Sequence, residues 1–114
     1  MKNRLLLALL LVGLAGGGLA QQIGDPARGR QVFNKCIACH KVGPDARIGI
    51  GPPLNGIVGR PAGTYRGYTY SNANANSGVT WDVETLTAYL PAPSQFLPGT
   101  KMIFPGLSEG AGRC

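Results

Sequence analysis

The sequence predicts a small all-α protein in which a few short helices are joined by long loops. Two stretches, residues 26–37 and 80–90, have apolar side chains at helical spacing. The segment between them, residues 41–66, is dense in Gly and Pro and has neither helical nor strand periodicity. A chain of 114 residues has room for one small domain. Because such loops have no evident core, we expect the fold to gain stability from a disulfide, a metal or a bound cofactor.

Residues 1–20 are predicted to be a signal peptide. Lys2 and Arg4 precede an apolar run from Leu5 to Leu14, and small residues follow up to Ala20. The alternative is an uncleaved membrane anchor, but a spanning helix needs about 20 apolar residues and glycines interrupt this run early. We therefore expect a mature domain of residues 21–114 that lies outside the cytoplasm, in the periplasm.

The mature domain is mildly basic. Without Lys2 and Arg4, nine basic and five acidic residues remain, which leaves a net charge of +4. This charge suits an acidic protein partner or peripheral contact with an anionic membrane. It is too weak and too scattered to predict nucleic-acid binding.

The first helix is predicted to begin at Pro26, with Asp25 as its N-cap. Val32, Phe33 and Cys36 share one face of this helix, which should carry the chain into the segment CIACH.

Further along the chain, the segment SNANANSG is rich in turn formers and has room for one short helical turn. The clearest second helix is TWDVETLTAYL, capped by Thr80 or Asp82 and ended by prolines. Its predicted apolar stripe comprises Val83, Leu86 and Leu90. A turn, SQFLPGT, then leads to Met102.

The segment CIACH carries the chemistry. In C-x-x-C-H, two thiols three residues apart face the same way and can add to the two vinyl groups of one haem, while the histidine binds the iron. Cys36, Cys39 and His40 occupy these positions, and His40 is the sole histidine. A redox C-x-x-C or half of a zinc site is the alternative. A redox motif is typical of a βαβ context, which these loops do not offer, and a zinc site needs four ligands that this chain does not supply.

Met102 is the candidate for the second axial position of the iron. It is the sole methionine of the mature chain, and it lies in a loop framed by Gly and Pro instead of on an apolar helix face. A buried methionine is more often core filler. A thioether ligand would favour ferrous iron, raise the reduction potential and close the iron to substrates, which indicates electron transfer and not catalysis.

From Gly24 to Leu107 the sequence resembles class I c-type cytochromes, of the mitochondrial cytochrome c and bacterial cytochrome c2 type. The matching segments are GDPARGRQVFNKCIACHKV, GIGPPLNGIVGR, GYTYSNANANSGVTWDVETLTAYL and FLPGTKMIFPGL. The resemblance implies a small cytochrome c fold wrapped around one covalent haem c.

The resemblance also implies residue roles. Cys36 and Cys39 would form the thioethers, with His40 and Met102 as axial ligands and the Pro52 carbonyl bonded to the other nitrogen of His40. Three side chains would hold the haem propionates: Arg60, Tyr70 and Trp81. Three more would form a polar network near the second ligand: Asn74, Tyr89 and Thr100. Phe104 would shield the haem edge.

The implied function is that of a soluble, monomeric one-electron carrier. Its expected partners are redox proteins: a cytochrome bc complex and a terminal oxidase or photosynthetic reaction centre. Lys35, Lys41 and Lys101 would steer acidic partners to the exposed haem edge.

The end of the sequence departs from the family pattern. Class I cytochromes c close with a helix that packs on the first helix, where Gly29, Val32 and Phe33 would receive it. Here SEGAGRC follows Leu107 and is too short and glycine-rich for such a helix, and Cys114 is left unexplained. We therefore expect the C-terminal helix to be missing. Two alternatives follow: a haem-bearing subunit of a larger dehydrogenase, or an impaired cytochrome whose open haem site has weak peroxidase activity.

Overall fold

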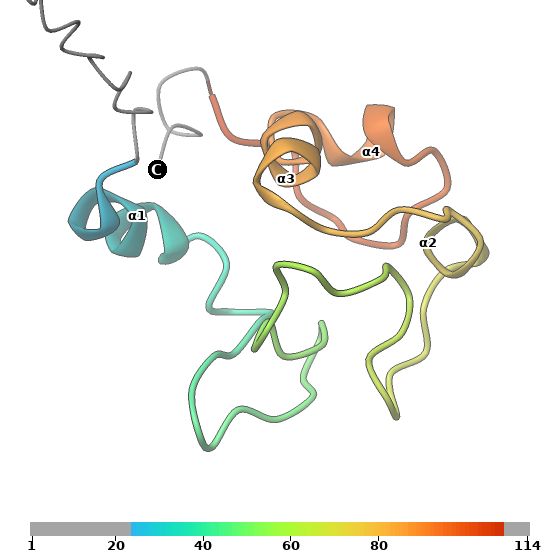
Figure 1. Cartoon of the computed structure of the whole chain (residues 1–114), viewed down its shortest axis with the longest axis horizontal. Coiled ribbons are helices and arrows are strands. Elements are labelled where there is room, and N and C mark those ends of the chain that lie inside the picture. Colours follow the sequence, from blue (N-terminus) through green and yellow to red (C-terminus); the bar gives the residue numbers. More distant parts are fainter. Residues whose placement is uncertain (1–23, 109–114) are drawn as a thin grey trace, which may run out of the picture.

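The computed structural model describes residues 24–108, which contain four helices joined by loops (Figure 1). In chain order these are α1 (Pro26–Phe33), α2 (Asn72–Ala75), α3 (Val83–Tyr89) and α4 (Pro93–Phe96). The β pairing within this range is an isolated bridge between Pro61 and Thr80. The all-α prediction is confirmed. The predicted signal peptide and Cys114 lie outside the described residues.

Helix α1 begins as expected. The Asp25 carboxylate accepts hydrogen bonds from the backbone N–H groups of Ala27 and Arg28, and Pro26 occupies the first turn. The helix ends at Phe33, earlier than the sequence predicts. From there the chain enters CIACH through hydrogen-bonded turns, in which Cys36 N–H donates to Phe33 O at 2.8 Å.

Helix α3 has the predicted cap, and Leu86 and Leu90 of the predicted stripe pack against the core. The Asp82 carboxylate accepts from Thr85 N–H, and the Thr85 hydroxyl accepts from Asp82 N–H, which completes a capping box. The predicted stripe is wrong at Val83, which is 71% exposed, whereas Tyr89 is the buried residue of the helix. An aromatic side chain reaches the core because α4 packs against this part of α3.

The two short helices are built on local signals. Ser71 caps α2 by accepting from Asn74 N–H at 3.1 Å. Pro93 does more than end α3: it also starts α4, because its fixed φ suits a first helical turn. The sequence predicts only a turn here, so α4 is an additional element.

The core lies around α3 and α4 (Figure 1). Its buried members are Ala62, Trp81, Tyr89 and Leu97. The rings of Trp81 and Tyr89 lie 4.8 Å apart between centroids, and Tyr89 meets Phe96 edge to face at 5.6 Å. Met102 is half-buried against this cluster, so the predicted ligand loop is anchored on the best-packed part of the described chain.

Helix α1 lies apart from this core. Of the helices in the described range, α3 and α4 contact each other and α1 contacts none (Figure 1). A surface groove of about 420 Å³ follows α1 and is lined by Pro26, Gly29, Arg30, Phe33 and Val42. Gly29 and Phe33, two of the three residues predicted to receive a packing helix, therefore line an open surface. None of the helices within residues 24–108 has the length and apolar character that crossing a bilayer requires.

Candidate functional site

The CIACH segment forms one tight turn that gathers the two thiols and the histidine. The backbone N–H groups of Cys39 and His40 both donate to Cys36 O, at 3.0 and 2.8 Å. Both thiols are free and half-buried. Burial raises the pKa of the Cys36 thiol and the neighbouring Cys39 raises it further, while Lys35 opposes both effects. The turn thus presents two thiols at the spacing that covalent haem attachment requires.

The His40 ring is held from two sides. Its Nδ1 lies 2.8 Å from the carbonyl oxygen of Pro52, and because a carbonyl can only accept, Nδ1 carries the proton. The lone pair of Nε2 is then available for a metal. On the other side the ring presses on Gly51, where an added Cβ would lie 2.4 Å from Cε1 of the imidazole. Only glycine fits at this contact.

Met102 is oriented by the aromatic core and its polar neighbours. The Tyr89 hydroxyl donates to the Met102 sulfur at 3.2 Å. The Met102 N–H donates to the Thr100 hydroxyl at 3.3 Å. Burial raises the pKa of Tyr89, and a hydrogen bond with the Thr100 side chain partly offsets this. The structure therefore brings Tyr89 and Thr100 together with Met102, as the sequence predicts for the polar network.

The side chains predicted to hold propionates have other partners within the described residues. The Arg60 guanidinium donates to the carbonyl oxygens of Pro53 and Asn55, each at 3.1 Å. The Tyr70 hydroxyl accepts from Tyr65 N–H at 3.0 Å. Trp81 is buried in the core. Arg60 has five N–H donors, so these two bonds leave donors for another acceptor.

Two further predicted pocket residues are Asn74 and Phe104. Phe104 is half-buried. One buried atom of the Asn74 side chain, Oδ1, has no hydrogen-bond partner among the described residues. A buried oxygen without a partner is costly, so Asn74 Oδ1 is suited to accept a hydrogen bond from a group outside the polypeptide.

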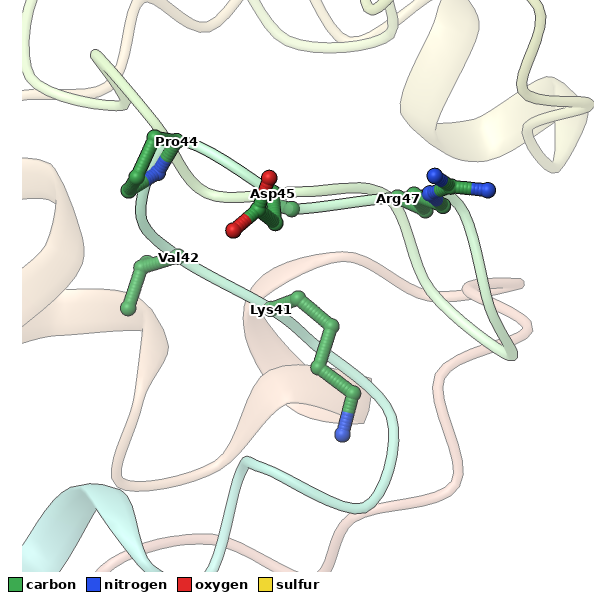
Figure 2. Close-up of a pocket in the computed structure, with 6 residues that line it drawn as sticks. Lys41, Val42, Pro44, Asp45 and Arg47 are labelled. Atoms are coloured by element: carbon green, nitrogen blue, oxygen red, sulfur yellow. The ribbon is translucent and has the colours of Figure 1, made fainter.

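The three predicted docking lysines are exposed. The Lys41 ammonium donates to Ile37 O at 2.7 Å, which ties it to the CIACH turn. Figure 2 shows Lys41 extending away from Asp45, at the rim of a shallow depression of about 390 Å³. The residues that line it are Lys41, Val42, Pro44, Asp45, Ala46 and Arg47. Lys101 donates to Thr69 O and lies over the ring of Tyr68.

Sequence reasoning missed two residues at this site, Gly51 and Tyr68. The glycine that directly precedes Pro52 was a signal for close backbone approach. Tyr68 gives no such signal, because its contacts reach Ile50 and Lys101, which lie far from it along the chain.

Two thiols and an imidazole at C-x-x-C-H spacing on one turn are typical of a protein that attaches a haem covalently. Comparison with known proteins supports this class. The family model for cytochrome c matches residues 26–108. The chain belongs to the cytochrome c family.

Individual relatives agree with this assignment. The chain is 56% identical to cytochrome c2 of Rhodoblastus acidophilus over 90 residues, which is 79% of this chain and 84% of the relative. It is 47% identical to cytochrome c2 of Rhodomicrobium vannielii over 103 residues, 90% of this chain and 82% of the relative. Among solved structures, cytochrome c2 from Rhodospirillum centenum superposes with a TM-score of 0.75 at 41% identity, covering 79% of this chain and 91% of that one.

Family membership settles the cofactor and the general function. The cofactor is one covalently attached haem c with its iron, as predicted. The protein transfers electrons between redox proteins and is not an enzyme. The two alternatives, a dehydrogenase subunit and an open-site peroxidase, are not favoured by these relatives.

Proposed function

We propose that this protein is a soluble periplasmic one-electron carrier whose haem is attached through Cys36 and Cys39 and ligated axially by His40 and Met102. When bound, the haem supplies an iron that alternates between the ferric and ferrous states. The chain's own residues hold the ligands in place and keep the iron closed to substrates. Thioether ligation would set a high reduction potential.

The observation that carries the proposal is the hydrogen bond between His40 Nδ1 and Pro52 O. It selects the tautomer whose Nε2 is a ligand, and it fixes the plane of the ring. Pro52 and Pro53 are both buried, so the carbonyl that accepts this bond belongs to a rigid segment. This fixed tautomer and ring plane support the proposed role of His40 as an iron ligand.

The residues present also fit the rest of the haem. The spare N–H groups of Arg60 would donate to the acidic edge of the cofactor, and the unpartnered Oδ1 of Asn74 would accept from water beside it. Apolar side chains that the chain leaves exposed would pack on an apolar group: Ile48, Ile50 and Val58. We propose that Arg60, Tyr70 and Trp81 hold the propionates, and that Phe104 shields the haem edge.

The partners follow from the relatives and the charge. Several relatives are cytochromes c2, and the mature chain is basic. We propose that the protein docks as a monomer on acidic surfaces of a cytochrome bc complex and of a terminal oxidase or photosynthetic reaction centre. Lys35, Lys41 and Lys101 would steer this encounter.

The test is an optical spectrum of protein produced together with haem-attachment machinery. We expect a low-spin spectrum with the sulfur-to-iron absorption band near the red end. Met102→Leu should abolish the band at nearly constant side-chain volume, because it removes the thioether. Ile103→Leu is the matched control, since Ile103 is the next residue and is fully exposed. Survival of the band in Met102→Leu would contradict the ligand assignment.

A further inference from the structure

Tyr68 contacts both segments that carry the proposed axial ligands. Its hydroxyl donates to Ile50 O at 2.9 Å, and its ring lies 4.4 Å from the Lys101 ammonium. Ile50 precedes Pro52, which orients His40, and Lys101 directly precedes Met102. One half-buried side chain thus lies between two segments that are far apart in the sequence.

On the His40 side, Tyr68 holds one particular peptide group. The carbonyl of the peptide between Ile50 and Gly51 accepts from the Tyr68 hydroxyl, and its N–H donates to Cys39 O at 2.9 Å. This peptide leads directly into Gly51, where the imidazole ring leaves no room for an added Cβ. A shift of this peptide would therefore move the Gly51 backbone beside the His40 ring.

On the Met102 side, Tyr68 and its neighbour hold Lys101. The ammonium donates to Thr69 O and lies over the face of the Tyr68 ring, where a cation is attracted. An exposed lysine would otherwise sample many rotamers. Its anchoring restricts the backbone next to Met102.

The Tyr68 ring is itself fixed, so it can transmit displacement. It meets the Tyr70 ring edge to face, with centroids 4.8 Å apart and an interplanar angle of 79°. The Tyr70 hydroxyl in turn accepts from Tyr65 N–H.

We propose that Tyr68 is a positioning residue that couples the two axial-ligand segments, so that loosening of the Met102 segment loosens the support of His40, and the reverse. The proposal rests on the ligation proposed above. It predicts that the two ligand segments open together and not independently.

The experiment measures hydrogen exchange in the haem-loaded protein, with the Gly51 amide as the readout on the His40 side. Lys101→Leu removes the cation that lies over the Tyr68 ring, which is the contact on the Met102 side. We expect Gly51 exchange to rise about fivefold, as for the loss of one hydrogen bond. Lys101→Arg keeps a cation over the ring and should restore most of the protection.

A double-variant cycle tests whether the Tyr68 hydroxyl carries the coupling. Tyr68→Phe keeps the ring but removes the bond to Ile50 O, so adding Lys101→Leu to it should no longer change Gly51 exchange. The reverse readout is displacement of Met102 by added imidazole, which should be several-fold faster in Tyr68→Phe. Tyr65→Phe is the control, because its ring lies near Arg60 and not Lys101.

Unchanged Gly51 exchange in Lys101→Leu would overturn the coupling, and so would additive effects in the double variant. These outcomes are separate from failure of the proposed ligation. Wild-type protein without the sulfur-to-iron band would contradict the ligation, whereas Gly51 exchange is measured in any folded, haem-loaded chain.

Discussion

The Tyr89 hydroxyl donates a hydrogen bond of 3.2 Å to the sulfur of Met102. Tyr89 is buried, and Trp81 and Phe96 flank its ring, so the donor cannot easily turn away. The bond therefore gives the sulfur a defined position and draws electron density from it. Both effects bear on the iron to which we assign Met102.

Removal of this hydroxyl should lower the reduction potential. In Tyr89→Phe the sulfur donates more strongly to iron, which favours the ferric state. A bond worth about 0.5–1.5 kcal/mol corresponds to a decrease of about 20–60 mV for one electron. The measurement is a redox titration followed optically, with Tyr65→Phe as a control that removes a phenol hydroxyl other than the one that donates to Met102. An unchanged or higher potential in Tyr89→Phe would contradict this role.

A methyl group at Gly51 should displace His40. The added Cβ would lie 2.4 Å from the imidazole, and its neighbours are the ring atoms themselves, which cannot give way while bonded to Pro52 O. We expect Gly51→Ala to destabilise the haem-loaded protein by about 1–3 kcal/mol and to perturb its low-spin spectrum.

Gly49→Ala is the matched control for that experiment. A Cβ at Gly49 would meet Cys39 O at 3.6 Å, an ordinary contact. Its denaturation midpoint and spectrum should stay close to those of the wild type. Equal effects at the two positions would show that the contact between Gly51 and His40 has no special importance.

Gly106 is predicted to be indispensable for docking the chain that follows Met102. Its φ is +123°, and a Cβ there would lie 1.8 Å from Pro91 O. Close approach at this point lets Leu107 N–H donate to Leu90 O at 2.9 Å, where the Leu107 side chain is buried. Gly106→Ala should lower the free energy of unfolding by more than about 3 kcal/mol, beyond the range of backbone strain alone.

Gly43→Ala separates strain from collision in the same denaturation experiment. Gly43 has a φ of +107°, but nothing lies within 4 Å of the position that an added methyl group would occupy. It should therefore show the strain alone, about 1–3 kcal/mol. If Gly43→Ala were as damaging as Gly106→Ala, contact with Pro91 would not be the cause.

The cap of α3 should make stability depend on acidic pH. Hydrogen bonds from the backbone and side chain of Thr85 lower the pKa of Asp82. Because the folded-state pKa lies below that of the unfolded chain, this stabilisation is present above about pH 4 and is lost as the pH falls through the folded value. In Asp82→Asn, which keeps a capping side chain but does not titrate, the Tm should depend less on pH.

The measurement is the Tm of the haem-loaded protein from about pH 6 down to about pH 3, a range that spans the titration of an aspartate. Glu84→Gln is the control, because it removes a carboxylate from the first turn of α3 and leaves the capping box intact. A Tm profile in Asp82→Asn that matches the wild-type profile would refute the prediction.

The sequence alone predicted the features that depend on interactions between residues close together in the chain. Asp25 and Asp82 cap helices through their own side chains, and prolines set helix boundaries, so these features were predictable from neighbouring residues. The spacing of Cys36, Cys39 and His40 is also local, which is why the haem could be predicted before any fold was known.

Predictions that required contacts between distant segments were less successful. Val83 fits an apolar stripe but is exposed, because what covers a helix face depends on where α4 packs. The propionate role of Arg60 stays a prediction, but the sequence did not show that its guanidinium bonds two carbonyls of the segment that follows Pro52. Neither outcome can be derived from periodicity, since periodicity describes one element at a time.

By itself, then, the sequence determined the helical class, the haem-attachment turn and the candidate ligands, because each depends on residues near one another in the chain. Only the tertiary structure decided how the ligands are held. Three contacts across loops do this: Gly51 lies beside His40, Tyr89 bonds Met102, and Tyr68 contacts both Ile50 and Lys101. Such contacts exist only once the chain has closed those loops, at a cost in entropy that packing and hydrogen bonds must offset.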